Sequence, residues 1–155
     1  AAVAKASAAR PQQRSLVRSA VALLVQNPQL ASVIEPPWTF AELRLPGVPL
    51  LVELIALCRD RPDITTGALI EHFAEREEAR ALQKLAVMEF PGGEEEVRAE
   101  FLGAIVQLDR QTESQRRSDL HLRLKELESK GTEGLTEGER NELRQLLVAK
   151  EARSQ

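Results

Sequence analysis

Apolar residues recur at helical spacing along most of the chain, and proline or glycine separates one run from the next. In residues 12–26 they cover much of a helix surface, which predicts a largely buried helix. Asn27 and Pro28 end this helix, because the residue before a proline disfavours helical geometry. Pro28 can itself begin a short helix over residues 28–34.

The next helical segments are short, and a proline, a glycine or an aspartate stands near each break. The first has the capping-box spacing at residues 39–42, where Thr39 would accept a hydrogen bond near Glu42 and Glu42 would reach back. The others are a helix over residues 49–59, a helix capped by Thr65 or Thr66, and a helix that carries Leu82, Leu85 and Met88 and stops before Pro91.

A long helix is predicted from residue 94 to about residue 130, since no cluster of helix breakers interrupts this range. Three glutamates open it, where they complement the positive end of the helix dipole. Residues 109–119 contain no large apolar side chain. A helix that is polar on every side usually bridges two packed units through solvent, so we expect a polar bridge here.

The C-terminal leucines predict an antiparallel helical hairpin. Gly131 and Gly134 make its turn, and residues 136–139 form a second capping box that opens a final helix to about residue 153. Two helices bury little apolar surface by themselves, so another molecule is expected to cover the hairpin. The leucines assigned to this partner-binding surface are Leu120, Leu124, Leu127, Leu135, Leu143, Leu146 and Leu147.

These patterns predict an all-α fold, in which a compact bundle of short helices is followed by a long helix that leads into the hairpin. The expected parts are a linker (1–11), a helical bundle (12–108), the polar bridge (109–119) and the hairpin (120–155). The chain begins with Ala1, and its only methionine is Met88. We therefore expect a fragment of a longer protein.

Composition narrows the function. A net charge of -3 gives no global attraction to nucleic acid or to a membrane surface. Cys58 is the only cysteine, which excludes an intramolecular disulfide and a zinc site built from thiolates. Together with the absence of a long apolar run, this indicates a cytoplasmic protein without a membrane partner.

No arrangement of residues indicates catalysis. The two histidines, His72 and His121, lie on different predicted helices without another histidine or cysteine nearby in the sequence. The glutamates at 94–96 fit a helix start better than a metal site. Residues 92 and 93 lack the further glycine and the Lys-Ser/Thr pair of a phosphate loop. We therefore predict a binding module that is not an enzyme and that holds no cofactor.

Three cations could meet beside apolar side chains if the first, third and fifth predicted helices pack together. Such a pocket would suit an acidic peptide with a hydrophobic end, which would be attracted by charge and held by burial. Unrelated surface charges around an ordinary core remain an equal alternative. The set consists of Arg14, Arg18 and Lys84 with Leu16, Val17, Val21 and Leu50.

A second alternative is a helical nucleic-acid-binding domain. It would use Arg10, Arg14, Arg18, Arg116 and Arg117. Such a domain requires a steep salt dependence of DNA affinity, and the net charge argues against it.

Several short motifs occur in the order found in the C-terminal domain of bacterial replicative DNA primases, which the chain resembles. The resemblance covers roughly residues 12–150. It rests on Leu-Leu-Val-Gln-Asn-Pro at 23–28 with Leu-Ala at 30–31, Leu-Pro-Gly at 45–47, Thr-Thr-Gly at 65–67 with Leu69, Glu71 and His72, Leu-Gln-Lys-Leu at 82–85, and Gly-Leu-Thr-Glu-Gly-Glu-Arg at 134–140.

The resemblance implies two partners. The hairpin of such domains docks on the amino-terminal domain of the hexameric replicative helicase. The bundle can hold the acidic C-terminal tail of single-stranded DNA-binding protein, at positions that match Leu16, Val17, Arg18, Val21, Leu50 and Lys84. Primer synthesis, with its zinc and magnesium, belongs to other domains of such primases.

Overall fold

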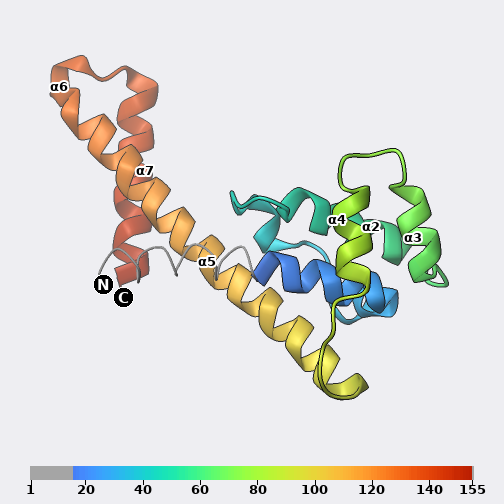
Figure 1. Ribbon diagram of the computed structural model, residues 1–155. Coiled ribbons are helices and arrows are strands. Elements are labelled where there is room, and N and C mark those ends of the chain that lie inside the picture. The colour runs from blue at the N-terminus through green and yellow to red at the C-terminus, as the bar shows by residue number, and fades with distance from the viewer. Residues whose placement is uncertain (1–15, 155) are drawn as a thin grey trace, which may run out of the picture. The chain divides into compact units, whose positions relative to one another are not determined.

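In the computed structural model, which describes residues 16–154, every regular element is a helix, so the all-α prediction is confirmed (Figure 1). The expected linker and the start of the first helix lie outside the described residues. After the first helix (16–26) the elements are η1 (Pro28–Val33), η2 (Thr39–Glu42), α2 (Val48–Asp60), α3 (Thr66–His72), α4 (Ala79–Ala86), α5 (Glu94–Ser129), α6 (Gly131–Gly134) and α7 (Glu137–Ser154).

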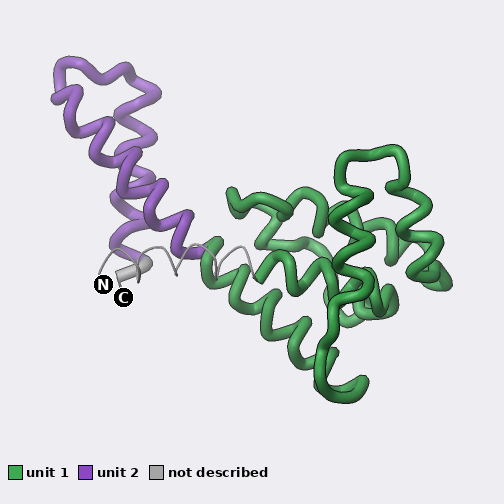
Figure 2. Tube along the Cα trace, in the orientation of Figure 1, with its two compact units in different colours: residues 1–112 green, residues 113–155 purple. Residues whose placement is uncertain are grey.

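The chain divides into two compact units, which are Ala1–Thr112 (unit 1) and Glu113–Gln155 (unit 2), as Figure 2 shows. The division falls inside α5, so this one helix contributes to both units. The division also falls within the range 109–119 that the sequence predicts to be a bridge.

Unit 1 is built around the first helix, whose residues 20–25 are all buried. A helix that is apolar on all sides needs neighbours on all sides. α2 packs against η1 and η2, α3 packs against α4, and the first half of α5 adds Phe101 and Leu108 to the same core. Three phenylalanines, Phe40, Phe73 and Phe101, are among the largest fully buried side chains.

Polar side chains at the end of the first helix join it to α3 and α4. The Gln26 side-chain amide donates to the backbone carbonyls of Leu85 and Met88, at 2.9 and 2.6 Å. The Thr66 hydroxyl donates to the Val25 carbonyl at 2.8 Å. The Val25 carbonyl lies in the last turn of the first helix, where carbonyls lack an intrahelical partner, and the Thr66 hydroxyl supplies one. Gln26 and Thr66 therefore join the first helix to the end of α4 and to α3.

Replacing Gln26 with alanine is expected to destabilise unit 1 by about 1–2 kcal/mol, because two hydrogen bonds to the end of α4 are lost together. Urea unfolding followed by circular dichroism measures the change. Gln83→Ala, at an exposed position of α4, is the matched control and should alter the free energy of unfolding by less than about 0.5 kcal/mol. Equal effects of the two substitutions would contradict this role of Gln26.

Two predictions within the bundle are wrong. Thr39 does not cap a helix, since Trp38 occupies the N-cap of η2 without a side-chain capping bond and Thr39 is the first residue of a four-residue 3-10 turn. Met88 does not continue the apolar face of α4, because that helix ends at Ala86 and Met88 is exposed. The helix cap at residues 65–66 is confirmed for Thr65, whose hydroxyl accepts from the Ala68 amide at 3.1 Å.

α5 begins and ends close to where the sequence predicts and contains 36 residues. Its start is closed by Glu96, which accepts a hydrogen bond from the Gly93 amide at 2.9 Å. In the range predicted to be a polar bridge, one side chain lies in the interior: Thr112 is fully buried, and its hydroxyl donates to the Leu108 carbonyl. Burial also raises the pKa of Asp109, opposed by a hydrogen bond with the Phe40 backbone.

Unit 2 is the predicted antiparallel hairpin. Ion pairs join Arg123 of α5 to Glu142 and Lys130, which directly follows α5, to Glu139, so the later of the two cations pairs with the earlier residue of α7. The capping box at residues 136–139 is confirmed in both directions, because the Thr136 hydroxyl accepts from the Glu139 amide and the Glu139 carboxylate accepts from the Thr136 amide, each at 3.1 Å.

Candidate partner-binding sites

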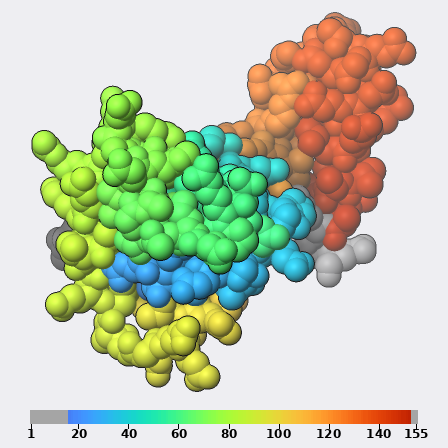
Figure 3. All heavy atoms as spheres, turned by 90° about the vertical axis from the view of Figure 1, so that its right-hand side faces the viewer, coloured from blue at the N-terminus to red at the C-terminus, as the bar shows by residue number. Residues whose placement is uncertain are grey.

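A pocket of about 460 Å³ opens between the first helix and α4 in unit 1. The two segments also come to the surface side by side in the space-filling view, blue and yellow-green (Figure 3). Arg18 comes from the first helix, and the other lining residues come from α4 or the turn before it. The lining consists of Arg18, Glu77, Arg80, Ala81, Lys84 and Leu85.

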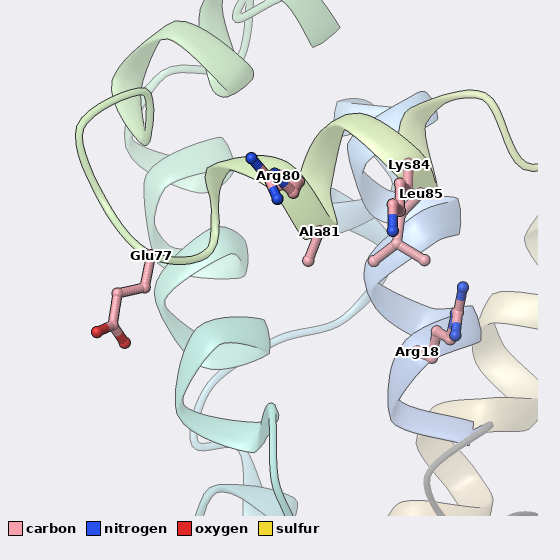
Figure 4. Close-up of a pocket in the computed structure, with 6 residues that line it drawn as sticks. All are labelled: Arg18, Glu77, Arg80, Ala81, Lys84 and Leu85. Carbon is pink, nitrogen blue, oxygen red and sulfur yellow. The ribbon is translucent and has the colours of Figure 1, made fainter.

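The pocket combines positive charge with an apolar surface. The side chains of Arg18, Arg80 and Lys84 form no ion pair or hydrogen bond with any of residues 16–154. Figure 4 shows the side-chain nitrogens of Arg18 and Lys84 turned toward each other beside Leu85, while the carboxylate of Glu77 points away. Unpaired cations beside apolar carbon suit a ligand that carries both acidic and hydrophobic groups.

The structure brings together only part of the predicted basic and apolar set. Arg18 and Lys84 share the pocket. Val17 and Val21 are buried in the core, and Leu16 and Leu50 are partly buried against it. Arg14 lies outside the described residues. These four apolar residues therefore shape the bundle in which the pocket lies, although none of them is among its lining residues.

Arg80 lines the pocket but is absent from the predicted set. It stands four residues before Lys84 on α4, which places both side chains on one face of the helix. This i, i+4 spacing is visible in the sequence and was the available signal. From the sequence alone, however, this spacing is the same as that of two solvent-exposed cations on an ordinary helix face.

The predicted hairpin leucines separate into interior and surface residues. Leu124, Leu127 and Leu135 are buried. Leu120, Leu143 and Leu146 are partly buried, and Leu147 is 43% exposed. Sequence reasoning left Leu122 and Val148 out of the set, although they are exposed by 64% and 66%.

Ion pairs fix the two hairpin helices against each other. Arg123 donates two hydrogen bonds to the Glu142 carboxylate, at 2.7 and 2.8 Å, and pairs with Glu126 at 3.0 Å. Hydrogen bonds from Lys130 and from the Thr136 backbone lower the pKa of Glu139 to about 2. The hydrogen bonds from Arg123 lower the pKa of Glu142. These charged side chains of the two helices thus pair with each other. The exposed apolar side chains remain in contact with solvent.

The arginines that a nucleic-acid-binding domain would use lie in different surroundings in the structure. Arg10 and Arg14 lie outside the described residues, and Arg18 lines the pocket of unit 1. Arg116 pairs with Glu113 at 3.4 Å, and Arg117 is exposed.

Residues 16–154 contain no group of three or more histidine, cysteine, aspartate or glutamate residues that could hold a metal ion. None of the helices described is both long enough and apolar enough to cross a membrane. The edge of the exposed His72 ring contacts the buried Phe73 ring at a centroid distance of 5.0 Å, and His121 is exposed.

The family described as DNA primase DnaG DnaB-binding matches residues 17–146, which include residues of both units. DNA primase of Escherichia coli K12 is 40% identical over 75 residues, which are 48% of this chain and 13% of that protein. DNA primase of Pasteurella multocida is 31% identical over 145 residues, which are 94% of this chain and 24% of that protein. The chain thus spans less than a quarter of these relatives.

A solved structure supports the same relationship. The C-terminal domain of DnaG primase from Vibrio cholerae aligns with a TM-score of 0.57 and 28% identity, over 86% of this chain and 92% of that one. The family match, the primase relatives and this shared fold agree with one another. The chain belongs to the DnaB-binding family of DNA primase DnaG.

Proposed function

We propose that this chain is the helicase-binding module of a bacterial DNA primase, and that unit 2 docks on the amino-terminal domain of the hexameric replicative helicase. The observation that carries the proposal is the family match over residues 17–146, which reaches through α5 into α7. In the longer protein the module recruits primase to the helicase at the replication fork, in the bacterial cytoplasm. It is non-catalytic, and the zinc and magnesium of primer synthesis belong to other domains.

The docking surface consists of exposed apolar side chains of the hairpin, which are Leu122, Leu147 and Val148. The buried leucines cannot contact a partner while the hairpin is folded, so they act by forming the hairpin. Burial of exposed apolar side chains supplies affinity, and a few such residues usually carry most of it. The charged residues around them affect the association rate more than the affinity.

Val148→Glu is expected to weaken helicase binding about 30-fold, because it places a charge on the apolar surface that the partner covers. Titration calorimetry with the helicase amino-terminal domain measures this. The matched control is Val87→Glu, which makes the same change at a valine of unit 1 that is 79% exposed. The control should bind as the unaltered chain does.

Leu122→Glu and Leu147→Glu, measured in the same way, extend the test over the proposed surface. Circular dichroism of each variant establishes that the hairpin is still folded. Unchanged helicase affinity in all three folded variants would exclude docking through these residues. Complete binding by a chain that lacks residues 132–155 would exclude docking through the hairpin altogether.

The pocket of unit 1 supports a second function, which is to bind the acidic C-terminal tail of single-stranded DNA-binding protein. Arg18 and Lys84 would pair with acidic side chains or the terminal carboxylate, and Leu85 would contact an apolar residue. Fluorescence polarisation with a labelled synthetic tail peptide tests this. Lys84→Glu should abolish measurable binding at low salt, whereas Lys125→Glu, at an exposed lysine of unit 2, should not.

A further inference from the structure

The Arg80 side chain has no partner among the described residues of unit 1. Nearby arginines do have structural contacts. Arg76 pairs with Glu53 and Glu78 and lies over the Phe73 ring, 4.8 Å from its centroid. Arg59 donates to the backbone carbonyls of Ala31, within η1, and of Ile34, which follows η1. Arg80 has no such contact within residues 16–154, and it lines the pocket.

α4 concentrates positive charge on the face that borders the pocket. Its sequence, Ala-Arg-Ala-Leu-Gln-Lys-Leu-Ala, contains no acidic residue. The carboxylate of Glu77, which also lines the pocket, is turned away from the cations (Figure 4). Ala81 and Leu85 also line the pocket, so apolar side chains accompany the two cations there.

The spacing of the two α4 cations gives a measure of the ligand. The Cβ atoms at positions i and i+4 of a helix are about 5–6 Å apart, so the two cationic side chains leave α4 with this spacing. An extended peptide advances about 3.3 Å per residue, so two residues cover about 6.6 Å. Acidic side chains at alternate positions of an extended peptide would therefore match Arg80 and Lys84.

We propose that Arg80 is a specificity-determining residue of the pocket, which selects extended peptides that carry a second acidic residue two positions from the one bound by Lys84. The inference rests on the proposed binding of an acidic tail by the same pocket. Peptide is favoured over nucleic acid because Leu85 and Ala81 offer apolar contacts that a phosphate backbone does not use.

The test uses the full chain and two labelled synthetic peptides in fluorescence polarisation at low salt. Both end in three apolar residues with a free carboxylate and carry an aspartate before them. The first has another aspartate two positions further from the end, and the second has serine there. Arg80→Ala should weaken binding of the first peptide about three-fold, which is the effect of one exposed ion pair, and leave the second unchanged.

Two variants sharpen the comparison. Arg80→Lys should retain most of the selectivity, since it keeps the charge. Arg144→Ala removes an exposed arginine from α7 and should change neither affinity. Circular dichroism of Arg80→Ala should match that of the unaltered chain, because Arg80 has no partner within the described residues.

The outcomes separate the two proposals. If the unaltered chain binds neither peptide, the proposed tail-binding function fails. If it binds the first peptide through Lys84, but Arg80→Ala weakens both peptides equally or neither, only the selective role of Arg80 fails. If single-stranded oligothymidine displaces the peptide, with a steep salt dependence and a larger loss in Arg80→Ala, the occupant is nucleic acid and the inference is overturned.

Discussion

Leu127→Ala is expected to cost unit 2 about 2–5 kcal/mol, the usual cost of truncating a fully buried leucine. The hairpin has few residues that can compensate, since Leu124 and Leu135 are the other buried large apolar side chains among its described residues. A two-helix unit of this size has little stability to lose. We therefore expect the hairpin to unfold, with a loss of helicity in circular dichroism and of helicase binding in calorimetry.

Leu122→Ala provides the control for the loss of stability and helicity only, because Leu122 itself belongs to the proposed docking surface. It removes the same atoms from α5, but at a position that is 64% exposed, so stability should change by less than about 0.5 kcal/mol. Peptide binding in the pocket of unit 1 should survive Leu127→Ala. A Leu127→Ala chain with full helicity and full helicase affinity would show that the interior of the hairpin does not depend on this residue.

Phe73→Ala is expected to cost unit 1 about 3–5 kcal/mol. Phe73 is fully buried at the end of α3, and its ring also carries the Arg76 guanidinium. Its loss leaves a cavity beside α4, the helix that holds Arg80 and Lys84. Both the free energy of unfolding in urea and the affinity for the acidic peptide should fall.

His72→Ala is the control for Phe73→Ala, because it truncates the neighbouring but exposed ring. It should lower stability by less than about 1 kcal/mol and leave peptide affinity unchanged. If both substitutions had the same small effect, the packing of α3 against α4 would not depend on the aromatic core.

The parts of the fold that were predicted correctly depend on neighbours in the sequence. The Thr136–Glu139 capping box forms because both partners lie within one helical turn. The extent of α5 follows from the glycines and prolines that flank it and from their scarcity within it. Such local rules need no knowledge of the tertiary structure.

The wrong predictions concern segments controlled by distant residues. α4 ends at Ala86. The Gln26 side chain, 59 and 62 residues away in the sequence, donates hydrogen bonds to the Leu85 and Met88 carbonyls. The segment at Thr39 follows the burial of Phe40 in the core and closes as a short turn. No periodicity within these segments records either contact.

The candidate sites were harder to predict than the fold, because one residue type serves two purposes. A leucine pattern cannot distinguish Leu127, which is buried, from Leu147, which faces solvent. The proximity of Arg18 and Lys84 could be proposed because their helices were expected to pack together. Arg80 could be found only from the structure, because only the structure shows which cationic side chains lack an ion pair or hydrogen bond.

Cys58 and Trp38, the only cysteine and the only tryptophan, both belong to unit 1. Cys58 is buried, and burial raises the pKa of its thiol to about 11, so little reactive thiolate exists at neutral pH in the folded chain. Alkylation of this thiol and emission from the indole therefore report the opening of the bundle alone. Unit 1 thus contains two intrinsic probes of its own unfolding. Unfolding confined to the hairpin should change neither the alkylation rate nor the emission.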